Sequence, residues 1–283
     1  MFMSNPFAEL SAQVPVAVMQ GYIILMVLLV VIGTIMDMKH KKSAKYFFLN
    51  AEKEKRNAKR EVGAGEKIGI AAAVLLKEVA TSGEFCNVRR RLSHLLTMWG
   101  FILFVATTAI LIFGYPTPAT PAPAIVPQLW HIGALILAVG GYWFWFFIRV
   151  DVSAEGLTWW RLERADLFIL SLLATSTFAL LWSLAQYRGI AGWSTLFLIL
   201  FAVSGVVLFG GVYWSKFAHM FFKPAAAFQK RVTRADGSRE DLPFDYDPRD
   251  PEVQRKYPDI AEYMGKNPPN MGRGIRRERP SHY

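Results

Sequence analysis

The sequence predicts an all-α membrane protein with five transmembrane helices, an external amino terminus and a cytoplasmic carboxyl terminus. Three observations support this prediction: long apolar runs, the distribution of lysine and arginine between them, and tryptophans at their ends. Hydrophobic residues make up 53% of the 283 residues. A single soluble core of this size needs fewer, so the excess is expected to face lipid.

Five apolar runs are long enough to cross the ~30 Å hydrocarbon core of a bilayer, which takes roughly 20 helical residues. They are residues 16–36, 95–113, 131–148, 167–187 and 193–213. Tryptophans near the ends of these runs are typical of the membrane–water interface. They are Trp130, Trp159, Trp160, Trp193 and Trp214.

Basic residues determine the predicted orientation. Lysine and arginine are concentrated in segment 39–92, in loop 149–166 and in the carboxyl-terminal part of the chain, so the positive-inside rule places all three in the cytoplasm. Connection 115–129 carries no charge and connection 188–192 has one arginine, so both are expected outside. The first fifteen residues contain no lysine or arginine, unlike a cleavable signal peptide, so the first run is expected to be retained.

These features divide the chain into four predicted parts. Residues 1–38 form the amino terminus and first helix, 39–92 a basic cytoplasmic segment, 93–223 a domain of four membrane helices, and 224–283 a polar cytoplasmic tail. Residues 66–79 have a polar stripe on an apolar body and are too short to span, which predicts an interfacial helix. Proline, aspartate and arginine dominate the tail, so we expect it to have little core of its own.

Two of the five histidines share a predicted depth in the membrane. His94 directly precedes the second run, and His219 follows the fifth by about one turn on the same side. Neutral imidazole is a good axial ligand for haem iron, and two facing rings from neighbouring helices can hold one haem. Arg90 and Arg91, about one turn before His94, are candidates for pairing with the haem propionates. The alternative is that both histidines are ordinary interfacial residues.

The helix faces around these histidines are compatible with a flat macrocycle. A helix continued back from His219 presents mostly small residues, which let a ring approach the backbone: Ser215, Gly211, Leu208 and Ser204. The face of His94 continues through Met98, Phe101, Val105 and Thr108.

Other polar residues at the run ends have simpler interpretations. His131, beside Trp130, has no second histidine at its depth, so it is a candidate to hydrogen-bond a quinone carbonyl or remains an interfacial histidine. Asp166 is predicted to cap the fourth helix. His40 and His282 lie in charged or terminal segments and are expected to be solvated. The single cysteine excludes a disulfide or a cysteine-ligated iron–sulfur cluster within this chain.

Short motifs resemble a known family of membrane cytochromes. Residues 75–108, with R-x-x-H at Arg91 and His94 and W-G-F at 99–101, resemble the start of the second membrane helix in the nitrate-reductase gamma-like cytochrome b family. That family includes the membrane parts of heterodisulfide reductase and of the quinone-interacting membrane-bound oxidoreductase. Residues 129–149 are similar to its third helix, and HMFFKP at 219–224 to the end of its fifth.

The resemblance implies a subunit of a bacterial cytoplasmic membrane that holds haem b between His94 and His219 and exchanges electrons with quinone. The chain has fewer membrane histidines than two-haem members need, and it lacks the cysteine-rich cluster domain of the quinone-interacting relatives. It is most similar in format to the membrane anchors associated with adenylylsulfate reductase in sulfur-metabolising bacteria. The expected partner is therefore a soluble cytoplasmic iron–sulfur or flavin enzyme, adenylylsulfate reductase among the candidates. The alternatives are a cofactor-free anchor and, less favoured because midplane charges are missing, a small transporter.

The polar tail is expected to bind this soluble partner. Its apolar side chains are spaced within charged sequence, as in a segment that becomes ordered on a protein surface: Phe244, Tyr246, Tyr257, Ile260 and Tyr263. The alternative is a disordered solubilising tail.

Overall fold

A computed structural model describes residues 1–41, 43–83, 85, 87–151, 156–215, 217, 219–239 and 249–264, and this part of the chain contains helices and no strand. The chain divides into two compact units. The membrane unit comprises Met1–Tyr46 and Asn87–Lys223, and the polar unit comprises Phe47–Cys86 and Pro224–Tyr283. The predicted all-α class is confirmed for the described residues.

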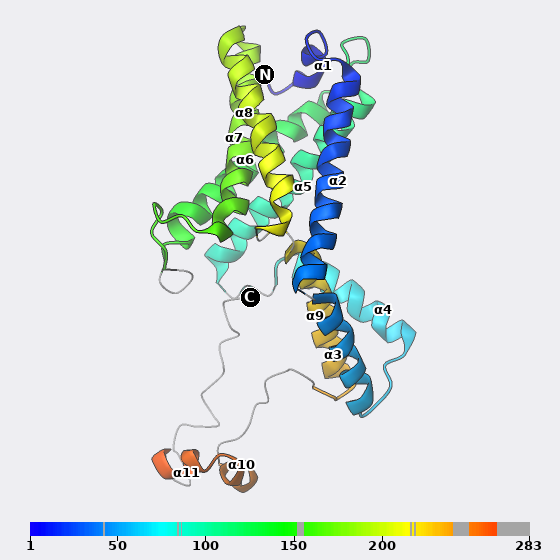
Figure 1. Ribbon diagram of the computed structural model, residues 1–283, viewed down its shortest axis with the longest axis vertical. Coiled ribbons are helices and arrows are strands. Elements are labelled where there is room, and N and C mark those ends of the chain that lie inside the picture. The colour runs from blue at the N-terminus through cyan, green and yellow to red at the C-terminus, as the bar shows by residue number, and fades with distance from the viewer. Residues whose placement is uncertain are drawn as a thin grey trace. The chain divides into compact units, whose positions relative to one another are not determined.

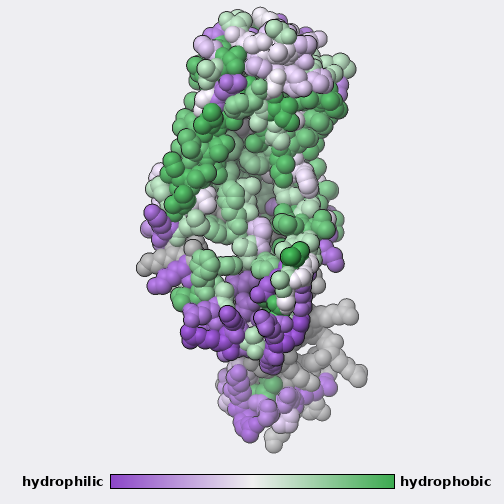
Figure 2. Space-filling model, turned by 90° about the vertical axis from the view of Figure 1, so that its right-hand side faces the viewer, coloured by the Kyte–Doolittle hydropathy of each residue, from purple (hydrophilic) through white to green (hydrophobic). Residues whose placement is uncertain are grey.

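Five helices of the membrane unit are long and apolar enough to cross a membrane (Figure 1). They are α2 (Val16–Lys41), α5 (Val88–Gly114), α6 (Ile125–Trp143) with its π-helical continuation η2 (Phe144–Ile148), α7 (Leu167–Tyr187) and α8 (Ala191–Gly210). Many of their apolar side chains point outward, including Val27 and Val203, which are 58% and 54% exposed. Figure 2 shows this hydrophobic surface in green. These features indicate a multi-pass membrane protein and confirm that each of the five predicted runs lies in a helix long enough to span a membrane, while their orientation stays a prediction.

Glycines allow α5 and α6 to pack backbone against backbone. A Cβ atom added at Gly100 would lie 2.6 Å from the backbone nitrogen of Leu137, and one added at Gly133 would lie 2.8 Å from that of Phe104. Small residues at crossing points are a common way for membrane helices to approach closely. This contact fixes α5 and α6 as antiparallel neighbours and thereby positions their functional residues.

The membrane unit has two ends, which are named here for what they carry. The α1 end contains residues 1–15, 115–124 and 188–190, with the short helix α1 (Pro6–Leu10) among them. The His94 end contains the start of α5, the connection from η2 to α7 and the short helix η4 (Gly211–Tyr213). Sequence patterns did not predict α1, because five residues are too few to establish a helical period.

The polar unit is also helical. Besides most of α3 (Ser43–Asn57), it contains α4 (Ala64–Ala73), η1 (Val74–Ala80), the greater part of α9 (His219–Ala235), α10 (Pro251–Lys256) and α11 (Pro258–Met264). The segment expected as an interfacial helix is therefore helical as α4 and η1, and its location on a membrane surface stays a prediction.

Helix α9 gives the first part of the predicted tail an ordered place in the polar unit. Arg231 Nε donates to Glu78 Oε1 at 2.5 Å, and the side chain of Gln229 donates to the Phe47 carbonyl at 3.5 Å. After the helix, the carbonyl of Asp236 accepts the Lys59 amide at 2.9 Å. The basic segment and the start of the tail thus pack together, an association that neither pattern alone indicates.

Candidate functional site

His94 lies in the second turn of α5, at the His94 end of the membrane unit. Asn87 starts this helix, because its side-chain oxygen accepts the backbone amides of Arg89 at 3.0 Å and Arg90 at 3.2 Å. Arg90 and Arg91 follow in the first turn, and both are half-buried, as is His94. Helical spacing therefore places the two guanidinium groups and the imidazole on one side of α5, as the sequence predicts.

The face of α5 that bears His94 is directed toward α8 and the segment that follows it. Phe101, two turns beyond His94 on this face, has its ring centroid 6.2 Å from that of Phe209 and 6.3 Å from that of Phe217. Phe217 is almost fully buried and also contacts Phe168 at 5.4 Å. The fold thus brings the His94 face against the segment that leads into His219.

His219 is the first residue of α9. Its side chain lies outside the described part of the structure, so the predicted pairing of the two imidazoles stays a prediction. The expected continuous helix back from His219 is wrong, because α8 ends at Gly210 and η4 at Tyr213 before α9 begins. Two consecutive glycines, Gly210 and Gly211, weaken the helix there because glycine is a poor helix former.

His131 lies near the α1 end and is fully buried. Its Nδ1 is 2.7 Å from the Pro127 carbonyl oxygen, and its Nε2 is 2.7 Å from Ser183 Oγ. A carbonyl oxygen only accepts, so Nδ1 carries the proton, and in the neutral ring Nε2 accepts the Ser183 hydroxyl. Both ring nitrogens are therefore bonded within the protein. A quinone carbonyl only accepts hydrogen bonds, so it could bind Nε2 only if Ser183 moved away and Nε2 gained a proton. The predicted quinone role stays a prediction with this added requirement.

The amino-terminal segment closes this end of the membrane unit. The Phe7 ring lies 5.5 Å from Trp130 and 5.3 Å from Trp182 between ring centroids, and the Phe2 ring lies 5.1 Å from His131. Trp130 and Trp182 are buried, so aromatic side chains fill the interior around His131. Chain segments far apart in sequence make these contacts, and no local pattern could have indicated them.

A buried ion pair organises the loop between α6 and α7. Arg149 is fully buried and Asp166 is 5% exposed, and the guanidinium binds the carboxylate through two bonds of 3.2 and 2.5 Å. The same guanidinium donates to the carbonyls of Thr158 and Arg161, each at 2.6 Å. Its carbon also lies 4.4 Å above the Trp145 ring. All three guanidinium nitrogens of this buried cation thus donate to oxygen atoms within the protein.

The role predicted for Asp166 needs correction. Its side chain makes no capping bond to α7. The carboxylate instead accepts the Glu163 amide at 2.8 Å, within a capping box that surrounds the short helix η3 (Arg164–Asp166), and pairs with Arg149. The pair spans seventeen positions of sequence, which explains why local capping rules did not reveal it.

In comparisons with known proteins, no protein-family model, curated protein or solved structure matches the chain.

Proposed function

We propose that this chain is a cytochrome b-like electron-transfer subunit that passes electrons between a cytoplasmic redox enzyme and the quinone pool of a bacterial cytoplasmic membrane. In this proposal the amino terminus is outside and the polar unit is cytoplasmic, where the basic segments favour it. The soluble enzyme performs the substrate chemistry. Adenylylsulfate reductase is the candidate partner, through the resemblance of the chain to anchors of that enzyme.

The observation that carries the proposal is the direction of the His94 face toward the segment that precedes His219. The contacts of Phe101 with Phe209 and Phe217 join these two parts of the chain near one end of the membrane unit. The imidazoles of His94 and His219 would then face each other from neighbouring elements, as bis-histidine ligation requires.

The residues at this end suit a haem b in their chemistry. His94 and His219 would be the axial ligands, and Arg90 and Arg91 would bind the propionates through charge-assisted bonds. The bound iron would supply one-electron exchange. The protein's own contribution is to hold the ligands at one depth and to line the adjacent interior with the apolar ring of Phe101.

An optical spectrum of the purified chain tests the proposal. Reduced minus oxidised difference spectra should show the α-band of a low-spin b haem, and His94→Ala should abolish it because one axial ligand is lost. His40→Ala is the matched control, since His40 is exposed and its ring contacts Tyr213 at 5.5 Å. A normal band in His94→Ala would contradict the assignment, as would a band lost equally in both variants.

The partner-binding part of the proposal rests on the tail. Tyr257 is 41% exposed in the described part, while Phe244 and Tyr246 and the side chains of Ile260 and Tyr263 lie outside it. Truncation after Arg239 retains α9 and its contacts with the basic segment. The truncated protein should release the partner from membranes and keep its haem spectrum. Full retention of the partner would show that docking occurs elsewhere.

The second candidate function is a cofactor-free membrane anchor for the same enzyme. The filled interior at the α1 end supports it, because Trp130 and Trp182 are at most 1% exposed and side chains of the protein itself occupy the space between the helices there. The two functions predict the same release of partner on truncation and opposite optical spectra. A purified chain without any haem band, even after expression with added haem precursor, would favour the anchor.

A further inference from the structure

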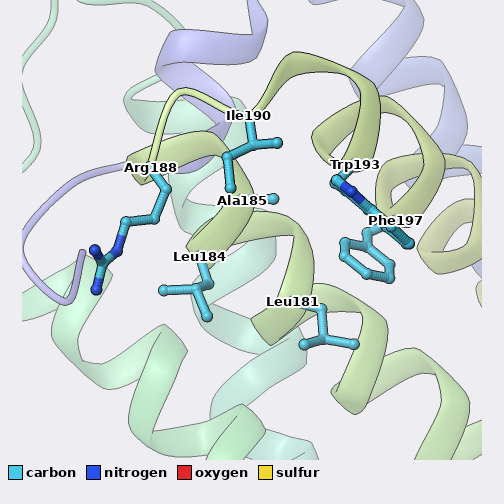
Figure 3. Close-up of a pocket in the computed structure, with 7 residues that line it drawn as sticks. All are labelled: Leu181, Leu184, Ala185, Arg188, Ile190, Trp193 and Phe197. Atoms are coloured by element: carbon cyan, nitrogen blue, oxygen red, sulfur yellow. The ribbon is translucent and has the colours of Figure 1, made fainter.

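An open groove of about 570 Å³ lies between the end of α7 and the start of α8. Figure 3 shows its lining, with Leu181, Leu184, Ala185 and Arg188 on the α7 side and Ile190, Trp193 and Phe197 on the α8 side. Its volume falls within the range of known ligand sites, roughly 300–1,000 Å³. Arg188 is the one charged side chain among these residues, so the groove is apolar with a cationic rim.

The groove opens on the lipid-facing surface of two membrane helices. Leu184 is 41% exposed, Ile190 50% and Trp193 53%, and all three lie near the end of an apolar span. The indole of Trp193 stacks on Phe197 with 5.5 Å between ring centroids. Tryptophan at this position is typical of the boundary between acyl chains and headgroups. The groove therefore extends from the headgroup level into the acyl region.

The charge on Arg188 has no counterion within the described protein. No carboxylate pairs with Arg188 in the described residues, and its side chain is exposed. Only one other charged side chain, Glu9, occurs in the segments 1–15, 115–124 and 188–190 that form the α1 end. Bonds from Asn5 to the Tyr115 carbonyl and from Gln186 to the Pro6 carbonyl tie these segments together. A lone cation beside an apolar groove is complementary to a phosphate that bears acyl chains.

We infer that this groove binds one anionic phospholipid, with its phosphate on Arg188 and one acyl chain along Leu184, Leu181 and Phe197. In Figure 3 the guanidinium is directed away from the Trp193 side of the groove, so a headgroup at Arg188 leaves the apolar floor to the chain. The start of α8 lies at the same rim and has no side-chain cap, and its positive dipole favours the same anion. The inference does not rest on the proposed haem or its ligands.

Native mass spectrometry of the full-length, delipidated protein tests it by titration with phosphatidylglycerol. The wild type should bind one molecule more tightly than any further ones. Arg188→Gln should weaken that site about fivefold, the factor that corresponds to ~1 kcal/mol for one basic side chain at an anionic lipid. Leu184→Trp should weaken it too, because the larger ring fills the groove. Leu184 is exposed, so this substitution does not disturb the core.

Arg164→Gln is the matched control, because Arg164 is exposed at the opposite end of the membrane unit. It should leave the tight site unchanged. Equal affinity of wild type and Arg188→Gln for phosphatidylglycerol would overturn the inference, as would equal binding of zwitterionic phosphatidylcholine. Displacement of the tight phospholipid by an equal concentration of a short-chain quinone would also overturn it and assign the groove to quinone.

Discussion

Replacement of Arg149 by glutamine should destabilise the membrane unit more than any exposed arginine substitution. The Arg149 guanidinium is fully buried and makes two bonds to Asp166 and further bonds to backbone carbonyls. Removal of one partner from a buried pair leaves an uncompensated charge and costs about 3–5 kcal/mol. At roughly 2–4 °C per kcal/mol, this corresponds to a Tm lower by about 6–20 °C. The measurement is the fraction of detergent-solubilised protein that remains monodisperse by size exclusion after heating.

The same loop provides the control. Arg161 is 68% exposed in its side chain and lies 3.6 Å from Glu163, and such exposed pairs contribute about 0–1 kcal/mol. Arg161→Gln should therefore change the Tm little. The double variant Arg149→Leu with Asp166→Leu removes both charges and should lose less stability than Arg149→Gln. Equal Tm values for Arg149→Gln and Arg161→Gln would refute the reasoning that burial makes this pair important.

Two further predictions concern helix packing and the polar unit. Gly100→Ala should cost about 1–3 kcal/mol of stability, because its Cβ would lie 2.6 Å from the Leu137 backbone nitrogen, whereas Gly114→Ala, with open space around it, should be neutral or slightly stabilising. Comparable Tm changes in both variants would contradict the close helix approach. Burial and the neighbouring Asp236 carboxylate raise the pKa of Glu54 above 4.5, so the folded polar unit binds a proton more readily than the unfolded chain. The stabilisation contributed by protonated Glu54 is therefore complete below pH ~4.5 and is lost as the pH rises through the higher pKa of the folded state. Glu54→Gln, compared with wild type by urea unfolding at several pH values, should flatten this dependence, and an unchanged slope would contradict it.

Hydrophobic patterning predicted the five membrane helices because each must bury about twenty apolar residues in lipid. It did not predict where α5 begins. The apolar run starts at residue 95, but the helix starts at Val88, because Asn87 caps it and polar residues continue the helix outside the hydrocarbon. This difference matters for the candidate site, since it places His94 in the second turn of α5 rather than just before the helix.

Two other features that sequence analysis missed depend on contacts between distant residues. The Arg149–Asp166 pair joins the end of η2 to the start of α7, and Phe7 of α1 packs on Trp130 of α6 and Trp182 of α7. In each case the local sequence signal was weak. Arg149 is one of several arginines in a basic loop, and α1 has only five residues. From sequence alone, Arg149 is one more positive charge that sets the orientation, and Phe7 belongs to a terminal segment. Their structural roles become visible only in the fold, where their distant partners lie beside them.

The packing at the two ends of the membrane unit bears on where a prosthetic group would fit. At the α1 end, His131 uses both ring nitrogens within the protein, and buried aromatic rings occupy the space beside it. A macrocycle there would have to displace Trp130, which is fully buried and donates to Thr108 at 2.8 Å. Loss of such a side chain from a packed core costs several kcal/mol, about 3–5 for tryptophan. At the His94 end the candidate ligands are a half-buried histidine and the first residue of a new helix, which follows the end of η4 at Tyr213. A single haem at the His94 end would therefore require less displacement of buried side chains than one at the α1 end.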